Sequence, residues 1–345
     1  MRRWIRHMLL FVLALAFVCG CKRIPLHERS TRVELKLNLK LDVDLELDLS
    51  YDTQLDEDFA MKLDGKEPEY MEVLFYDRYT HQLLLTQIVG PYGGVLDVPA
   101  GDYHMVAYNF GTESTQVEDL HHRLDAEAFT SDITKIMSSK FNAIQTNAPA
   151  ESKSDVKGYE TDPIIHEPDH LYVANKMDVT IPAFEGKEET VTIYADASTI
   201  LEVYSLEVLN IKGAENIEKV DAFITGQIKS NYFGKQERNT NPATLYVTLK
   251  TDVPNNRLYT VFETFGKLPG EDNKIYLDVT VTDSDGGQYR FIYDVTDQFD
   301  DPDNTSHSLV IDGSDIDIPD GKTGGGGLAP SVDEWENEII DVPLG

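Results

Sequence analysis

A strict alternation of apolar and polar residues runs from Val33 to Tyr51, in "VELKLNLKLDVDLELDLSY". Every odd-numbered position in this run is apolar, and every even-numbered position is polar. A period of two places the apolar side chains on one face of a β-strand, whereas a helix would scatter them around its circumference. At about 3.3 Å per residue the run would span roughly 60 Å, far more than an ordinary strand of about 17–20 Å. The pattern predicts two strands, or one strand that bends between two sheets, with its apolar face in a core.

Short apolar segments separated by turn residues continue as far as Asp312. The predicted strands before residue 198 are 72–77, 82–88, 95–98, 102–109, 170–174, 178–182 and 190–195. Those after it are 200–211, 220–226, 244–251, 258–265, 274–282, 288–295 and 308–311. "PAGDY" (99–103) predicts a tight turn, and "DSDGG" (283–287) predicts a hairpin between two alternating segments. Many short strands with little helix indicate an all-β protein of antiparallel sandwiches.

One segment has helical spacing. Its apolar residues recur three or four positions apart, which predicts a short helix over 116–129; they are Val117, Leu120, Leu124 and Ala128. Residues 145–165 are polar, contain scattered Pro and Gly, and predict a loop.

The chain is acidic, with 61 Asp and Glu against 30 Lys and Arg and a formal charge of −31. Such a charge repels a phosphate backbone and an anionic lipid surface, which disfavours nucleic-acid binding and direct adsorption to anionic lipid. A length of 345 residues predicts two domains with extensions.

The N-terminus resembles a bacterial lipoprotein signal. Three arginines within the first six residues precede an apolar run, Met8 to Val18, which is too short to span a bilayer as a helix. The run ends in "VCGC", which resembles a lipobox and implies cleavage before Cys21 and lipidation of its thiol. An ordinary signal peptide with an incidental cysteine is the alternative. With Cys19 removed and Cys21 lipidated, no cysteine would remain for a disulfide, a nucleophile or a metal site.

The last residues form a separate acidic region. "TGGGG" (323–327) predicts a flexible hinge, and "VDEWENEIIDVPLG" follows it. Ile340, Val342 and Leu344 alternate again, with Trp335 upstream, so this segment is a candidate strand that would join the edge of another sheet. The predicted organisation is a signal peptide (1–20), a tether (21–32), two β-sandwich domains (33–197 and 198–312) and a tail (313–345).

Sequence motifs for metal or catalytic chemistry are weak. "DQFDDPDN" (297–304) is rich in oxygen ligands but lacks the ligand spacing of a calcium loop, so it predicts a solvated turn. His121 and His122 would point about 100° apart on a helix and are predicted to be surface residues. The chain has no Gly-x-Ser-x-Gly, phosphate-loop or His-Glu-x-x-His motif, and we predict no metal, no cofactor and no catalysis.

Three segments carry a family resemblance: "EVLFYD" (72–77), "DVPAGDYHMVAYNFGTES" (97–114) and "HEPDHLYVA" (166–174). With the C-terminal "GGGG…VDEWENEIIDVPL", they resemble the FimB-type, fimbrillin-like anchor lipoproteins of Gram-negative gut and oral bacteria. The resemblance implies two tandem transthyretin-like antiparallel β-sandwich domains. It also implies a lipid anchor in the outer membrane, on the cell surface, and strand exchange with fimbrial shaft subunits.

Two questions remain open at this level. Lys22 and Arg23 follow Cys21, where surface-exported lipoproteins of these bacteria commonly carry acids, so a periplasm-facing location remains an alternative. A glycan-binding surface lipoprotein of a polysaccharide-uptake system is the alternative function. The long first strand and the C-terminal strand favour a protein that assembles with others.

Overall fold

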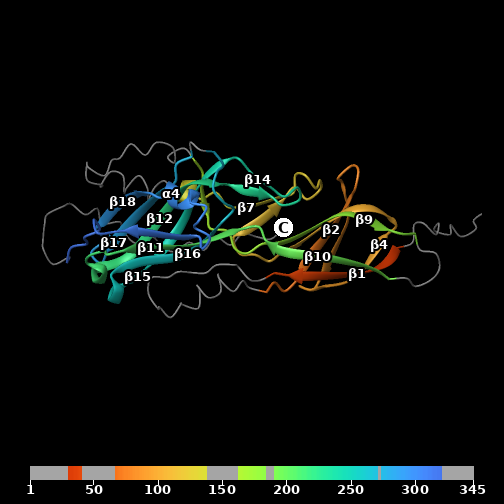
Figure 1. The fold of residues 1–345 in the computed structure, drawn as a ribbon, viewed down its shortest axis with the longest axis horizontal. Coiled ribbons are helices and arrows are strands. Elements are labelled where there is room, and N and C mark those ends of the chain that lie inside the picture. Colours follow the sequence, from red (N-terminus) through yellow and green to blue (C-terminus); the bar gives the residue numbers. More distant parts are fainter. Residues whose placement is uncertain (1–29, 41–66, 138–161, 184–189, 271–272, 321–345) are drawn as a thin grey trace, which may run out of the picture. The chain divides into compact units, whose positions relative to one another are not determined.

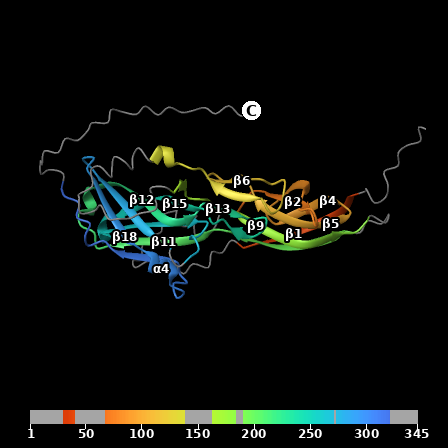
Figure 2. The ribbon, with the colours of Figure 1, turned by 90° about the horizontal axis from the view of Figure 1, so that it is seen from above.

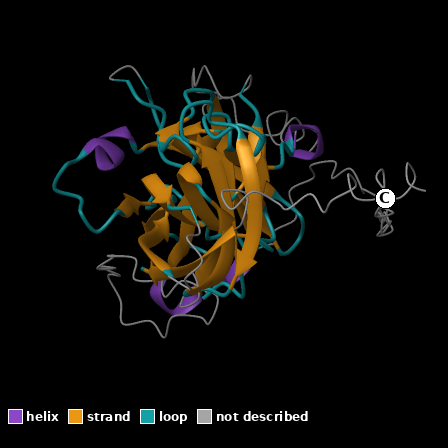
Figure 3. Cartoon of the chain, turned by 90° about the vertical axis from the view of Figure 1, so that its right-hand side faces the viewer, coloured by secondary structure: helices purple, strands orange, loops and turns teal. Residues whose placement is uncertain are grey.

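The computed structural model describes residues 30–40, 67–137, 162–183, 190–270 and 273–320 (Figure 1). The described chain is all-β, as the sequence predicts, and strands dominate the cartoon in Figure 3. The protein consists of two compact units. Unit 1 contains the described residues up to Leu39 together with Glu69–Tyr108 and Ala174–Ala197, and unit 2 contains the others. No helix in these described ranges is long and apolar enough to cross a membrane.

The first strand, β1 (Ser30–Leu39), confirms the first half of the alternating run. Val33, Leu35 and Leu37 are buried, at 0%, 1% and 5% exposure, whereas Arg32 and Lys36 are exposed. The buried side chains alternate with exposed ones because successive residues of a strand point to opposite faces. Residues 41–51, which hold the acidic half of the run, lie outside the described residues.

Unit 1 is built on one seven-stranded sheet, with strand order β3-β2-β5-β9-β10-β1-β4. Besides β1, its strands are β2 (Met71–Asp77), β3 (Leu83–Val89), β4 (Gly93–Pro99), β5 (Gly101–Asn109), β9 (Tyr172–Ile181) and β10 (Val191–Thr199). The sheet curls, because β3 and β4 stand at its two ends in this order yet meet through a bridge between Gly90 and Gly93. The predicted turn at "PAGDY" joins β4 to β5, and the Tyr103 hydroxyl donates to the Pro99 carbonyl at 2.9 Å.

Unit 2 contains an eight-stranded sheet; seven strands have the order β18-β17-β12-β15-β16-β11-β19, and the eighth, β8, pairs with β15. Figures 1 and 2 label β18, β12, β15 and β11 of this sheet. The bounds are β8 (Ile164–His166), β11 (Glu202–Leu209), β12 (Ile217–Ile228), β15 (Pro242–Asp252), β16 (Arg257–Thr264), β17 (Tyr276–Asp283), β18 (Gln288–Asp294) and β19 (Ser308–Asp312). A smaller sheet has the order β14-β13-β7-β6, formed by β6 (Thr115–Glu118), β7 (Glu127–Thr130), β13 (Ser230–Tyr232) and β14 (Glu237–Arg238).

The seven strands predicted after residue 198 are all present, because each carries apolar side chains that reach one continuous core. "DSDGG" forms the predicted hairpin. Gly286 N–H donates to the Asp283 carbonyl at 3.0 Å, and β17 and β18 pair antiparallel on either side of it.

The predicted helix over 116–129 is wrong. This segment is a β-hairpin in which β6 pairs with β7 and Val117 faces Ala128. Asp119, at a positive φ of 56°, ends the first strand, and His122 N–H donates to its carbonyl. The apolar spacing was helical by coincidence, since Val117 and Ala128 are neighbours across a hairpin and not along a helix.

The strand predictions differ from the structure in other places. Segments 170–174 and 178–182 contribute to one strand, β9, which passes through Asp178 at a positive φ of 58°. The last two residues of the predicted loop 145–165, Ile164 and Ile165, are buried and belong to β8, and the short strands β13 and β14 were not predicted.

Candidate functional site

The residues predicted to anchor the protein and to donate a strand lie outside the described residues. They are Cys21 at the N-terminus and Trp335, Ile340, Val342 and Leu344 in the tail. The candidate site is therefore built from two described features: the position of β1 in unit 1 and a group of polar side chains in unit 2.

β1 is an interior strand of its sheet. It pairs parallel with β10, where Leu35 faces Ile193, and antiparallel with β4, where Arg32 faces Asp97. The Thr31 hydroxyl also donates to the Pro182 carbonyl at 2.8 Å. Removing β1 would leave two unpaired strand edges above an apolar core, so this strand closes a slot that another extended chain could fill.

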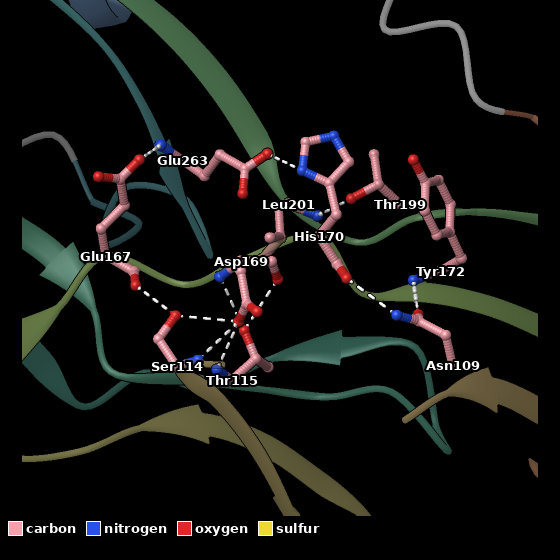
Figure 4. Close-up of polar contacts among 10 residues, drawn as sticks. All are labelled: Asn109, Ser114, Thr115, Glu167, Asp169, His170, Tyr172, Thr199, Leu201 and Glu263. Carbon is pink, nitrogen blue, oxygen red and sulfur yellow. Dashed lines mark hydrogen bonds and ion pairs between the residues drawn. The ribbon is translucent and has the colours of Figure 1, made fainter. Parts of the chain in front are cut away.

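A second feature joins two of the three sequence segments that carry the family resemblance, 97–114 and 166–174. Polar side chains from residues 109–115 and 167–172 form one hydrogen-bonded group in unit 2 with a residue of β16 (Figure 4). We call this group the polar clasp; it consists of Asn109, Ser114, Thr115, Glu167, Asp169, His170, Tyr172 and Glu263.

Asp169 holds one side of the polar clasp. Its carboxylate accepts backbone N–H groups of Glu113, Ser114 and Thr115, and the Ser114 hydroxyl at 2.9 Å. Burial alone would raise the pKa of Asp169, but the bonds from Thr115, Glu113 and Ser114 outweigh it and lower the pKa. The carboxylate is therefore charged at neutral pH and fixes the loop before β6.

His170 and Glu263 hold the other side. The imidazole Nδ1 pairs with the Glu263 carboxylate, and the two side chains are 10% and 3% exposed. The Glu167 carboxylate accepts the Glu263 backbone N–H at 3.0 Å, so it caps the same strand end. Burial, and then the charge of Glu263, raises the pKa of the neighbouring Tyr172 to about 12. These contacts tie the segment before β9 to β16.

Asn109 completes the polar clasp from the end of β5. Its side-chain amide donates to the His170 carbonyl at 3.1 Å and accepts the Tyr172 N–H at 2.6 Å. One amide therefore satisfies both backbone groups beside the start of β9, in the way that a neighbouring strand would.

The polar clasp positions backbone segments. The Ser114 hydroxyl shares its one hydrogen between the Asp169 carboxylate and the Glu167 carbonyl. His170 pairs with Glu263, so the serine and the histidine do not contact each other through these bonds. The hydrogen bonds of the Asp169 carboxylate and the Asn109 amide join chain segments that pack side by side, which is the arrangement of a structural staple. The sequence analysis identified both motifs but did not predict that they are in contact, because their residues lie more than 50 positions apart.

Unit 2 also contains buried ion pairs that the sequence analysis did not predict. Arg257, at 0% exposure, pairs with Glu207 and, through Nε, with Asp252 at 2.9 Å. Arg290 forms a bidentate pair with the buried Asp278. Such pairs fix geometry more than they add stability, because desolvation offsets most of the attraction.

The residues considered for metal chemistry lie in a closed loop and a short turn. In "DQFDDPDN", the Asn304 amide donates to the carbonyls of Gln298 and Ser308, so it closes the loop itself. The Nδ1 atom of His122 lies 3.1 Å from the Oδ2 atom of Asp125, and His121 is exposed. Within the described ranges, no group of three or more His, Cys, Asp or Glu side chains is arranged to hold a metal.

Two all-β units, an interior first strand and a polar clasp between distant segments define an all-β protein built from multi-stranded sheets. Residues 50–248, more than half of the chain, match the family described as "Domain of unknown function (DUF5119)", and the chain belongs to that family.

A relative identified by sequence agrees with the resemblance to fimbrial anchor proteins. The chain is 24% identical over 214 residues to a Bacteroides ovatus protein named "Putative fimbrium anchoring subunit Fim4B". That match covers 61% of this chain and 56% of the relative, so the chain spans little more than half the length of that relative.

One solved structure is similar in fold. A Bacteroides ovatus protein described as a "putative adhesin" has a TM-score of 0.53 and 20% identity, over 85% of this chain and 97% of its own. The fimbrial anchor protein Mfa2 from Porphyromonas gingivalis has a TM-score of 0.43 and 12% identity, over 77% and 83% of the two chains. The second score is too low to establish a shared fold.

Proposed function

We propose that this chain is a lipid-anchored structural protein that attaches a fimbrium to the outer membrane. The observation that carries the proposal is the place of β1: an interior strand of unit 1 that begins nine residues after Cys21. The name of the Bacteroides ovatus relative supports the fimbrial role, although the match covers only part of that protein. The role requires no catalysis.

The proposal gives the N-terminus a definite task. Cleavage before Cys21 and lipidation of its thiol attach the mature chain to the membrane, and residues 22–29 connect the lipid to β1. A single lipidated cysteine is enough to make the protein fractionate with membranes if it carries more than one acyl chain.

β1 then stays in its slot. In the sequence, Arg29 directly precedes β1 and Arg32 is its third residue. The resemblance to the fimbrillin family implies that shaft subunits lose their first strand by a cut after an arginine. A cut here would separate both folded units from Cys21 and release them from the membrane. Arg32 also lies within β1, opposite Asp97 of β4, where pairing protects the backbone. The anchor therefore keeps its own strand and accepts none from a neighbour.

The C-terminal segment supplies the contact with the shaft. Trp335, Ile340, Val342 and Leu344 would enter the slot of the first shaft subunit, with backbone pairing giving affinity and the side chains giving specificity. The proposal also includes two tandem transthyretin-like sandwich domains, with domain bounds near 33–197 and 198–312, as the family resemblance implies.

Deletion of residues 328–345 tests the donor role. The expected result is loss of cell-bound fimbriae while the lipoprotein itself stays folded and membrane-bound. The matched control is the replacement of the same residues by a Gly/Ser sequence of equal length, which keeps the length and removes the alternating side chains. Normally anchored fimbriae on either variant would refute strand donation by this segment.

A further inference from the structure

We propose that one end of unit 1 lies against the lipid bilayer, with Tyr79 in the headgroup layer. This inference rests on the lipidation of Cys21 in the proposed function. We call this end the tether pole; it is formed by Ser30, the turn Asp77–His81, the turn Pro99–Asp102 and the end of β9 at Pro182.

Hydrogen bonds join these segments into one surface. Ser30 faces Pro99 across the β1–β4 pairing, and the Thr31 hydroxyl donates to the Pro182 carbonyl at 2.8 Å. The Arg78 N–H donates to the Asp102 carbonyl at 3.1 Å. The Asp102 carboxylate accepts the Thr180 hydroxyl at 2.6 Å. The first described residue and the turn that carries Tyr79 therefore belong to the same end of the sheet.

Tyr79 is presented on a fixed turn. The Asp77 carboxylate accepts the backbone N–H of Tyr79 at 2.9 Å, and the backbone N–H and hydroxyl of Thr80 at 2.6 and 2.9 Å. Tyr79 is 75% exposed, the largest value among the large apolar side chains of the described residues. The Arg78 guanidinium lies 6.0 Å from its ring. An amphipathic aromatic ring beside a cation is typical of residues at a membrane interface.

The tether selects the bilayer as the partner of this surface. Nine residue steps separate Cys21 from Ser30, and a fully extended chain covers at most about 3.3–3.6 Å per residue. Ser30 can therefore be no more than about 30 Å from the lipidated cysteine. Such a short link keeps the tether pole at a high effective concentration beside the membrane, so a weak contact is populated without a strong intrinsic affinity.

Charge determines which membrane suits the contact. Without the three arginines of the signal peptide, the mature chain carries 27 basic and 61 acidic residues, a formal charge of −34. At the tether pole, Arg78 is 3.0 Å from Asp178, so this cation is already balanced. The contact is therefore with zwitterionic headgroups and depends on the tether, and unlipidated protein does not adsorb.

The test places a nitroxide label on a cysteine introduced at residue 79. Lipidated full-length protein is reconstituted into phosphatidylcholine vesicles, and label accessibility to oxygen and to a water-soluble nickel chelate is measured by electron paramagnetic resonance. The matched control is Tyr92→Cys, because Tyr92 is 56% exposed and its carbonyl accepts the Leu37 N–H near the other end of β1. Ser30 at the tether pole and Leu37 beside Tyr92 are seven strand residues apart, which is roughly 20 Å along β1.

The expected result is a several-fold higher ratio of oxygen to nickel accessibility at residue 79 than at residue 92, and equal aqueous ratios for both labels in unlipidated protein with vesicles. Equal aqueous ratios in lipidated protein that floats with the vesicles would overturn this inference alone. Mature protein that does not float and carries no lipid on Cys21 would overturn the lipid anchor as well. An interfacial signal in unlipidated protein would refute the dependence on the tether.

Discussion

Replacement of Asp169 by Asn tests the polar clasp, because it removes one charge and hardly changes shape. The carboxylate accepts four hydrogen bonds, three from backbone N–H groups and one from the Ser114 hydroxyl. In either orientation, the Asn amide nitrogen faces at least one of these donors. Hydrogen bonds to a charged group contribute about 1.5–3 kcal/mol each, and partial exposure reduces the loss. We expect Asp169→Asn to lower the free energy of unfolding by about 2 kcal/mol at pH 7.

The pH dependence sharpens this prediction. The pKa of Asp169 is lower in the folded protein than its ordinary value of 3.8. A carboxyl group with a depressed folded pKa stabilises the protein above its unfolded pKa, and this contribution is lost as pH falls through the folded value. The difference between wild type and variant should therefore be full at pH 7 and shrink below about pH 4.

Urea unfolding of the unlipidated mature chain measures the free energy, and amide hydrogen exchange at Ser114 and Thr115 reports the local effect. Both amides should exchange faster in Asp169→Asn. Asp297→Asn is the control, because Asp297 is exposed in the short helix α4 (Thr296–Asp300); it should change stability by no more than about 0.5 kcal/mol. Unchanged exchange at Ser114 and Thr115, or a stability difference independent of pH, would refute the role assigned to Asp169.

Three further substitutions, one of them with a matched control, test packing, ion pairing and turn formation. Leu35→Gln, on the buried face of β1, should cost at least about 2 kcal/mol by urea unfolding, while Lys36→Gln on the other face should cost less than about 0.5 kcal/mol; equal midpoints would reject the alternation. Arg257→Met leaves the Glu207 carboxylate buried without its guanidinium and should cost about 3–5 kcal/mol, and a midpoint like that of wild type would show that the pair is dispensable. Tyr103→Phe removes the bond to the carbonyl of Pro99 and should lower stability by about 0.5–1.5 kcal/mol, with a rise in stability as the contrary result.

Local patterns predicted most of the strands. Alternation located β1, and turn residues located the hairpin between β17 and β18, because both signals depend on neighbours in the chain. The helix over 116–129 failed because Val117 and Ala128 pair across a hairpin, and no local rule separates that from helical spacing.

The polar clasp was beyond sequence reasoning for a different reason. Asp169 and Thr115 are 54 positions apart, and Glu263 and Glu167 are 96 apart, so only the folded sheet order brings them together. The two motifs show a family resemblance, but a single sequence gives no reason to expect that they are in contact.

The proposed function depends on the lipid on Cys21, which would hold a fimbrium on the cell. The most direct measurement is the division of shaft subunit between cells and culture medium, in strains that carry wild-type protein or Cys21→Ala. Assembled fimbriae are expected to move from the cells to the medium in the Cys21→Ala strain, while the total amount of shaft subunit stays the same. Fimbriae that remain on the Cys21→Ala cells at the wild-type level would contradict the proposed function.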